Sequence, residues 1–271
     1  MRMKCNAKIN LGLSITEKRG DGFHNLESIF LPVPWCDIIE IQESEKTIFS
    51  SSGIPISGDH TNNLCMKAYH LLARDFVLPP VSIHLEKNIP IGAGLGGGSS
   101  DAAFVLKGLN ELFRLNLSTE RLEQLASMLG SDCPFFVQNK AAFVTGKGEL
   151  LDMSLKLDLN CYCLLVNPGI HISTKDTYGA IIPQKARFDL REINNLDKMD
   201  WQNRVVNDFE TALLPNYPEL VALRQTLMDL TPFYASMSGS GSSFFAFFKE
   251  EPKGYSFKNC TSKVFELNIN Q

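Results

Sequence analysis

The sequence lacks the features that mark membrane-spanning, secreted and nucleic-acid-binding proteins. No apolar run approaches membrane-spanning length among its 271 residues, and the N-terminal MRMKCNAKINLG alternates where a secretory signal would need an apolar core. Acidic and basic residues are mixed and the formal net charge is −4, so no concentrated basic patch predicts contact with nucleic acid. We therefore expect a cytoplasmic protein with no nucleic-acid or membrane partner.

Cysteine is present, but it is not arranged as a metal site or a disulfide framework. The seven cysteines are scattered, no CxxC pair occurs and no histidine cluster accompanies them. This pattern disfavours a zinc site and a disulfide-stapled fold, and reduced thiols fit a cytoplasmic compartment. The seven are Cys5, Cys36, Cys65, Cys133, Cys161, Cys163 and Cys260.

The spacing of apolar residues predicts a mixture of strands and helices. Residues 3–15 alternate strictly between apolar and polar, which is typical of a strand. Apolar residues recur at helical spacing over 102–113, whereas 46–62 is rich in Ser and Gly and predicts a loop. Because strands and helices do not alternate regularly, we expect an α+β fold. A dip in composition suggests two domains, 1–155 and 156–271.

The stretch PIGAGLGGGSSDAA, residues 90–103, holds five glycines and precedes a predicted helix. Glycine in regular structure costs roughly 0.5–1 kcal/mol relative to alanine, so this cluster predicts a loop with unusual backbone angles or a close backbone approach. Exposed N–H groups beside a helix N-terminus favour an anion such as phosphate. Ser99 and Ser100 add hydroxyls there, and Asp101 fits an acidic residue of the first helical turn.

Three phosphate-binding patterns compete to explain this loop. Gly92-x-Gly94-x-x-Gly97 matches the dinucleotide pattern, but the acidic residue expected about twenty positions later, Glu111, falls inside the next predicted helix. The triphosphate P-loop needs lysine where Gly98 stands. The signatures that accompany the protein-kinase loop are missing. A nicotinamide oxidoreductase is therefore a weaker alternative.

The same stretch resembles the central motif of the GHMP kinases (galactokinase, homoserine kinase, mevalonate kinase, phosphomevalonate kinase and relatives). KINLG at residues 8–12 is similar to the family's first motif, and SMSGSGSS at 236–243 to its third. The resemblance implies an ATP-dependent small-molecule kinase that uses Mg²⁺. It also implies a two-domain α+β architecture, with a ribosomal-S5-like N-terminal domain, a ferredoxin-like C-terminal domain and the active site in the cleft between them. No Mg²⁺ ligand can be assigned.

Two further segments are similar to one branch of this family. RGDGFHNLESIF at 19–30 and GSDCPFF at 130–136 resemble segments of kinases that phosphorylate the 2-hydroxyl of a cytidine diphosphate ester of methylerythritol, in non-mevalonate isoprenoid synthesis. The resemblance implies this small-molecule substrate. Another GHMP kinase, of the homoserine or mevalonate type, and a catalytically silent nucleotide-binding protein remain alternatives. A monomer and a homodimer are both compatible with the sequence.

The resemblance also implies roles for individual residues. Asp132 would be the catalytic base, and Lys8, on the polar face of the first strand, its charge partner. Phe23 and His24 would contact the cytosine, with phenylalanine where the family usually has tyrosine. For ATP the implied residues are Pro90, Ile91, Gly92, Ala93, Gly94, Leu95, Gly96, Gly97, Gly98, Ser99, Ser100, Asn63 and Lys87, and for the substrate they are Asn10, Thr174, Tyr178, Gly239 and Gly241, besides Phe23 and His24.

Overall fold

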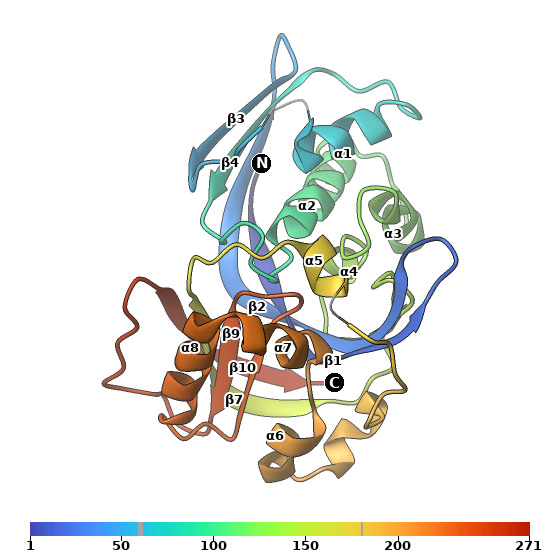
Figure 1. The fold of residues 1–271 in the computed structure, drawn as a ribbon. Coiled ribbons are helices and arrows are strands. Elements are labelled where there is room, and N and C mark those ends of the chain that lie inside the picture. The colour runs from blue at the N-terminus through green and yellow to red at the C-terminus, as the bar shows by residue number, and fades with distance from the viewer. Residues whose placement is uncertain (59–61, 180) are drawn as a thin grey trace. The chain divides into compact units, whose positions relative to one another are not determined.

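The computed structural model describes residues 1–58, 62–179 and 181–271, and of residues 174–176 only the backbone. The chain forms two compact units that are interleaved along the sequence (Figure 1). Unit 1 comprises Met1–Ala7, Pro34–Ile91 and Gly96–Lys140, and unit 2 comprises Lys8–Val33, Gly92–Leu95 and Ala141–Gln271. The division at residue 155 stays a prediction about family domains.

Two long strands contribute residues to both units. Strand β1 (Arg2–Lys18) pairs with β2 (His24–Glu43), which confirms the strand predicted over 3–15. The polar positions of β1 from Lys8 to Ser14 are buried together with the apolar ones. Both faces of this strand are therefore covered, although its alternating sequence is typical of a half-exposed strand.

The sheet of unit 1 joins the second half of β2 to two further strands. β4 (Val81–Lys87) pairs antiparallel with Ile38–Glu43, and β3 (Ile48–Gly53) pairs parallel with β4. The loop predicted for 46–62 is thus wrong over β3. That strand is short, mostly exposed and ends in SSSG, so it lacks the apolar alternation from which strands are predicted.

Helices cover an apolar core in unit 1. The helix α2 (Gly97–Leu112) packs against α1 (Leu64–Leu72), α3 (Thr119–Ser127) and α4 (Phe135–Gln138), as Figure 1 shows for α1 and α2. The Ser118 hydroxyl caps α3 by accepting from the backbone N–H of Arg121 at 3.3 Å. These contacts fix the helix that follows the glycine loop.

Unit 2 contains an antiparallel sheet in the order β10-β7-β9-β8. Its strands are β7 (Asp158–Asn167), β8 (Tyr234–Met237), β9 (Phe244–Phe248) and β10 (Thr261–Asn270). The first half of β2 pairs with β5 (Ala142–Thr145), which pairs with β6 (Leu150–Asp152). Sheets and helices in both units confirm the α+β class.

Helices of unit 2 fix the strand that leads into the third glycine motif. α6 (Trp201–Arg204), α7 (Asp208–Leu213) and α8 (Pro218–Met228) pack against β8, and α7 also packs against α5 (Thr174–Gly179). The carboxylate of Glu210, on α7, accepts the N–H of Met237 at 2.8 Å and the hydroxyl of Ser236 at 3.0 Å. The first two residues of the motif are therefore anchored to a helix.

Candidate functional site

The glycine loop buries the side chains of Ala93 and Leu95, whereas Ile91 at its start is 51% exposed. Ala93 and Leu95 are 3% and 1% exposed, whereas Gly92, Gly94 and Gly96 between and beside them have left-handed φ of 66°, 76° and 67°. No side chain caps α2, whose N-cap is Gly96. Backbone N–H groups at the start of this helix therefore have no side-chain cap, and their contact with an anion stays a prediction.

The second and third motifs are joined by hydrogen bonds within unit 2. The Ser238 hydroxyl donates to the carbonyl of Gly94 at 2.8 Å, and the N–H of Ser243 donates to the carbonyl of Ala93 at 3.2 Å. A Cβ added at Gly94 would lie 2.0 Å from the backbone carbonyl oxygen of Ser238. The loop thus approaches the third motif so closely that only glycine fits at this position.

The first motif reaches both of the others. The backbone N–H of Lys8 donates to the carbonyl of Leu95 at 2.9 Å, and the N–H of Asn10 donates to the Ser238 hydroxyl at 3.3 Å. A Cβ at Gly239 would lie 3.2 Å from the Gly94 carbonyl oxygen and 3.3 Å from Asn10 Oδ1. Three segments that are far apart in the sequence therefore meet in unit 2.

The side chains of Lys8 and Asn10 form a buried polar pair beside this junction. They are 4% and 1% exposed, and Lys8 Nζ donates to Asn10 Oδ1 at 2.5 Å. The ammonium also lies 4.1 Å from the centroid of the Phe30 ring, and Asn10 Nδ2 donates to Ser28 Oγ at 2.9 Å. A desolvated ammonium held in this way interacts strongly with any nearby negative charge, because water does not screen it.

We expect Gly94→Ala to lower kcat/KM for ATP by about 100-fold or more, because the new methyl group must displace the backbone of the third motif. The matched control is Gly254→Ala. Gly254 also has a left-handed φ, of 68°, but no atom lies within 4 Å of its added Cβ, so activity should stay within about twofold of the original. Steady-state kinetics on both variants measure the difference, and equal activities would contradict the close packing described above.

The predicted cytosine contacts gather in unit 2. The rings of His24 and Tyr178 stack on each other with centroids 5.0 Å apart and an interplanar angle of 28°. Phe23 is 53% exposed, and Lys147 Nζ lies 4.7 Å from its ring centroid. Because His24 and Tyr178 stack directly, no base fits between these two rings as they lie here. The side chain of Thr174, predicted to bind the substrate, lies outside the described residues.

Gly241, the other predicted glycine of the third motif, lies against apolar groups. A Cβ there would be 2.8 Å from the sulfur of Met237 and 3.3 Å from Cδ1 of Ile172. The adjacent Ser242 hydroxyl donates to the carbonyl of Ile170 at 2.5 Å. The third motif therefore also anchors the segment that leads into α5, the helix that carries Tyr178.

Unit 1 holds the remaining predicted residues. Asp132 lies in the turn between α3 and α4 and is half-buried, and its neighbour Cys133 is buried. Ser100 is fully buried, so its hydroxyl is not at the surface of the loop. Asn63 caps α1 by accepting the N–H of Cys65 at 2.8 Å, so a contact with adenine would use its amide nitrogen.

Lys87 is buried between two carboxyl groups, whereas a lysine that contacts a nucleotide is expected to be accessible. It is 4% exposed, and its ammonium donates to Asp101 Oδ2 at 2.7 Å and to a carboxylate oxygen of Asp37. The expectation that Asp101 is a first-turn acid is wrong, since it is the fifth residue of α2 and pairs with Lys87 inside unit 1. The role of Lys87 beside adenine stays a prediction.

Sequence reasoning missed several residues that build this site. Ser238 lies inside the quoted third motif, yet nothing in SMSGSGSS distinguishes the serine that bonds both other motifs from its neighbours. Ser28, whose hydroxyl accepts a hydrogen bond from the amide of Asn10, lies in RGDGFHNLESIF, where the resemblance implies no role for it. Asp37 stands in the alternating run DIIEIQ, where it looks like an ordinary polar position.

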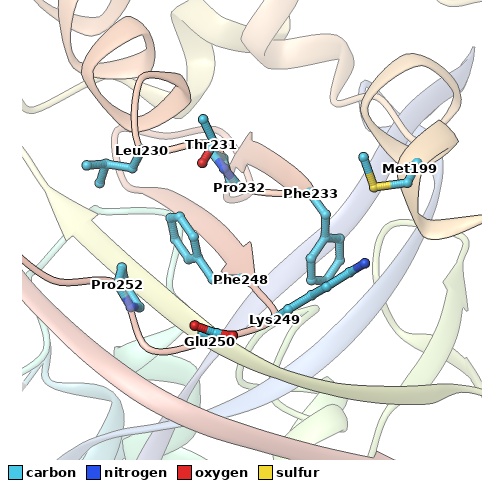
Figure 2. A pocket seen from close by; sticks show the side chains of 9 residues that line it. All are labelled: Met199, Leu230, Thr231, Pro232, Phe233, Phe248, Lys249, Glu250 and Pro252. Atoms are coloured by element: carbon cyan, nitrogen blue, oxygen red, sulfur yellow. The ribbon is translucent and has the colours of Figure 1, made fainter.

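A surface hollow of about 410 Å³ lies elsewhere in unit 2 (Figure 2). It is formed by the loop before β8, the end of β9 and the turn that follows, and none of its residues belongs to the three motifs. It therefore does not explain why those motifs converge. Its lining residues are Met199, Leu230, Thr231, Pro232, Phe233, Phe248, Lys249, Glu250 and Pro252.

The described residues contain neither a membrane-spanning helix nor a cluster of metal-binding side chains. No helix in the described ranges has the length and apolarity needed to cross a membrane. Across the same part of the chain, no three His, Cys, Asp or Glu side chains gather in a way that could hold a metal ion.

Several proteins resemble the chain along most of its length. A relative from Azobacteroides pseudotrichonymphae, named 4-diphosphocytidyl-2-C-methyl-D-erythritol kinase, is 50% identical over 247 residues, which cover 90% of this chain and 92% of the relative. A relative of the same name from Bacteroides fragilis is 48% identical over 255 residues, which cover 92% of each. A crystal structure of 4-(cytidine 5′-diphospho)-2C-methyl-D-erythritol kinase is 32% identical, with a TM-score of 0.74 over 91% of this chain and 90% of that one.

Two family models agree with these relatives. The model of the GHMP kinases N terminal domain matches residues 63–146, which include the glycine loop and Asp132. The model of the GHMP kinases C terminal domain matches residues 181–266, which include the third motif. The chain belongs to the GHMP kinases.

Proposed function

We propose that the chain transfers the γ-phosphoryl group of ATP to the 2-hydroxyl of 4-diphosphocytidyl-2-C-methyl-D-erythritol. The products are ADP and the 2-phosphate, which belong to the methylerythritol phosphate pathway of isoprenoid synthesis. One observation carries the proposal: the three GHMP motifs meet in unit 2, in a chain 48–50% identical to relatives that bear this kinase's name. Because the substrate is a small molecule, neither nucleic acid nor a membrane is needed as a partner.

In this proposal the glycine loop binds the nucleotide phosphates. The uncapped start of α2 offers backbone N–H groups to anionic oxygens, while the carbonyls of Ala93, Gly94 and Leu95 are bonded to the other motifs. Phosphoryl transfer requires mostly positioning and charge stabilisation from a protein. A loop tied by its own carbonyls to the third motif suits that task, because its amides are already oriented before the nucleotide binds.

Two charged residues complete the proposed chemistry. Asp132 accepts the proton of the 2-hydroxyl, which readies the oxygen for attack on the γ-phosphorus. Lys8 supplies positive charge that favours the ionised carboxylate and offsets the charge on the transferring group. The support for Lys8 is its buried ammonium, held by Asn10 and the Phe30 ring at the junction of the motifs.

Mg²⁺ enters the proposal as part of the ATP complex. Because the described residues gather no set of carboxylate, thiol or imidazole ligands, the ion would be held by phosphate oxygens and water, which is common for nucleotide-bound Mg²⁺. When bound, it would neutralise charge on the phosphate chain. No residue of this chain is assigned as its ligand.

An ADP-release assay with three alcohols tests the substrate. The protein is incubated with ATP and Mg²⁺ and with the cytidyl diphosphate ester, homoserine or mevalonate in turn. We expect ADP only with the cytidyl ester, since the segment DGFH and its aromatic surroundings serve no purpose for the smaller alcohols. Turnover of homoserine or mevalonate instead would assign a sister activity, and no turnover of any alcohol would support a silent nucleotide-binding protein.

The aromatic residues of unit 2 predict a change in substrate affinity alone. His24→Ala should raise KM for the cytidyl ester about tenfold, since stacking on a ring contributes ~1–3 kcal/mol per base. KM for ATP should change less than about twofold, because the ring of His24 stacks on Tyr178 and is predicted to contact the cytosine. The control is His70→Ala, an exposed histidine on α1. Equal KM values for the ester in both variants would remove His24 from the proposed cytosine contact.

A further inference from the structure

A buried group of three charged side chains lies beside the start of α2 in unit 1. Lys87, the last residue of β4, lies between Asp37 of β2 and Asp101 of α2, and the three are 4%, 0% and 2% exposed. The ammonium donates to Oδ2 of both carboxyl groups, at 2.7 Å in the case of Asp101. We call these three residues the clamp.

The clamp holds the chain at both ends of the glycine loop. Asp37 Oδ1 accepts the backbone N–H groups of Asn88 at 2.5 Å and Ile89 at 2.8 Å, and these residues directly precede Pro90. Asp101 is part of the helix that starts where the loop ends. The clamp also lies close to that start, because a Cβ at Gly97 would be 3.0 Å from Lys87 Nζ.

The charges of the clamp balance only when one carboxyl group keeps a proton. Burial raises the pKa of Asp101 to about 8, in spite of the attraction of Lys87, and the nearby negative charge of Asp37 raises it further. Burial by itself would lower the pKa of Lys87, but its attraction to Asp101 and Asp37 raises it. The raised pKa of Asp101 favours a proton on this carboxyl group, which brings the net charge of the clamp closer to zero.

The remaining contacts of Asp101 agree with a neutral acid. Its Oδ1 is buried and has no hydrogen-bond partner in the described part of the chain, which costs less for a neutral carboxyl than for an ionised one. Two titratable thiols also face it, Cys5 from β1 and Cys65 from α1. Burial raises the pKa of both thiols far above the physiological range, so neither adds charge to the clamp.

We propose that Asp37, Lys87 and Asp101 are positioning residues for the nucleotide, which fix the two ends of the glycine loop so that its backbone can receive the phosphates. The inference rests on the proposed kinase activity, because it requires that the loop bind ATP. It also predicts a dependence on pH. When Asp101 loses its proton, the clamp gains one net negative charge beside the start of α2, where a polyanion must bind, so ATP binding weakens.

The test compares ATP binding by the original protein and by Asp101→Asn across pH. Asparagine has the shape of the protonated acid and cannot ionise, so it can still accept the hydrogen bond of Lys87. From about pH 7 to about pH 9.5, we expect the Kd of ATP to rise about threefold to tenfold in the original protein and to stay flat in the variant. Calorimetry with ATP alone measures Kd without turnover. Asp75→Asn, an exposed carboxylate in the same unit, is the control that should keep the rise.

A second variant tests the clamp without a pH change. Lys87→Met keeps the length of the side chain but removes the ammonium that joins the two carboxyl groups. We expect it to raise the Kd of ATP at least about tenfold at neutral pH, with less than a twofold change in KM for the cytidyl ester. Circular dichroism checks that the variant is folded.

The outcomes distinguish a failure of the proposed positioning role from a failure of the proposed kinase activity. If the Kd of ATP depends on pH in the same way in the original protein and in Asp101→Asn, the proposed link between the Asp101 proton and ATP binding is wrong. An unchanged Kd in a folded Lys87→Met variant would overturn its positioning role. Normal pH-dependent ATP binding without ADP formation from any alcohol would support the clamp and overturn the proposed kinase activity alone.

Discussion

Replacing Asp132 by Asn should lower kcat by about 10²–10⁴-fold and change KM for ATP by less than about threefold. A positioned general base contributes a rate factor of this size, and asparagine cannot take up the hydroxyl proton at any working pH. The substitution keeps the size of the side chain in its half-buried turn between α3 and α4, so the loss should appear in the chemical step. Single-turnover kinetics with the cytidyl ester measure that step directly.

The matched control for this variant is Asp75→Asn. Asp75 lies in the same unit and forms an exposed ion pair with Arg121, with its side chain 47% exposed. Surface pairs of this kind contribute ~0.2–1 kcal/mol to stability, so kcat should not change. If Asp132→Asn retains more than about a fifth of the original kcat, another group takes the proton and the assignment of the base is wrong.

The elements that follow from local sequence were predictable. Strict alternation indicated β1, and helical spacing indicated α2, because each pattern places apolar side chains on one face of one element. Alternation does not show whether the opposite face is also covered. Lys8 and Asn10 look like ordinary exposed positions of a strand, and they are buried because the glycine loop and the third motif fold onto them.

The parts of the site that depend on distant pairing were not predictable from spacing. Asp37 and Asp101 are separated from Lys87 by 50 and 14 positions, and no periodic pattern joins a strand, a strand end and a helix through their charges. The glycines could be predicted as a group, because clusters of glycine are costly in regular structure. That Gly94 faces the carbonyl of Ser238 at a distance that excludes a methyl group follows only from the packed structure.

Removing the ammonium of Lys8 should lower kcat by about 10²–10³-fold, the effect typical of losing one preorganised group that stabilises charge in the transition state. Lys8→Met keeps most of the side-chain volume beside the Phe30 ring. It leaves Asn10 Oδ1 without its donor, which costs ~1–3 kcal/mol of stability. The same rate measurement should therefore be accompanied by thermal unfolding, and we expect the variant to stay folded at the assay temperature.

Lys4→Met separates the charge effect from a general effect of altering β1. Lys4 lies four positions earlier on the strand and is exposed, so its loss should change neither kcat nor stability by more than a small amount. The two lysines differ in what surrounds them, since only Lys8 is desolvated at the junction of the three motifs. If a folded Lys8→Met variant loses less than about fivefold in kcat, the buried ammonium serves the packing of that junction, and the charge needed for transfer comes from elsewhere.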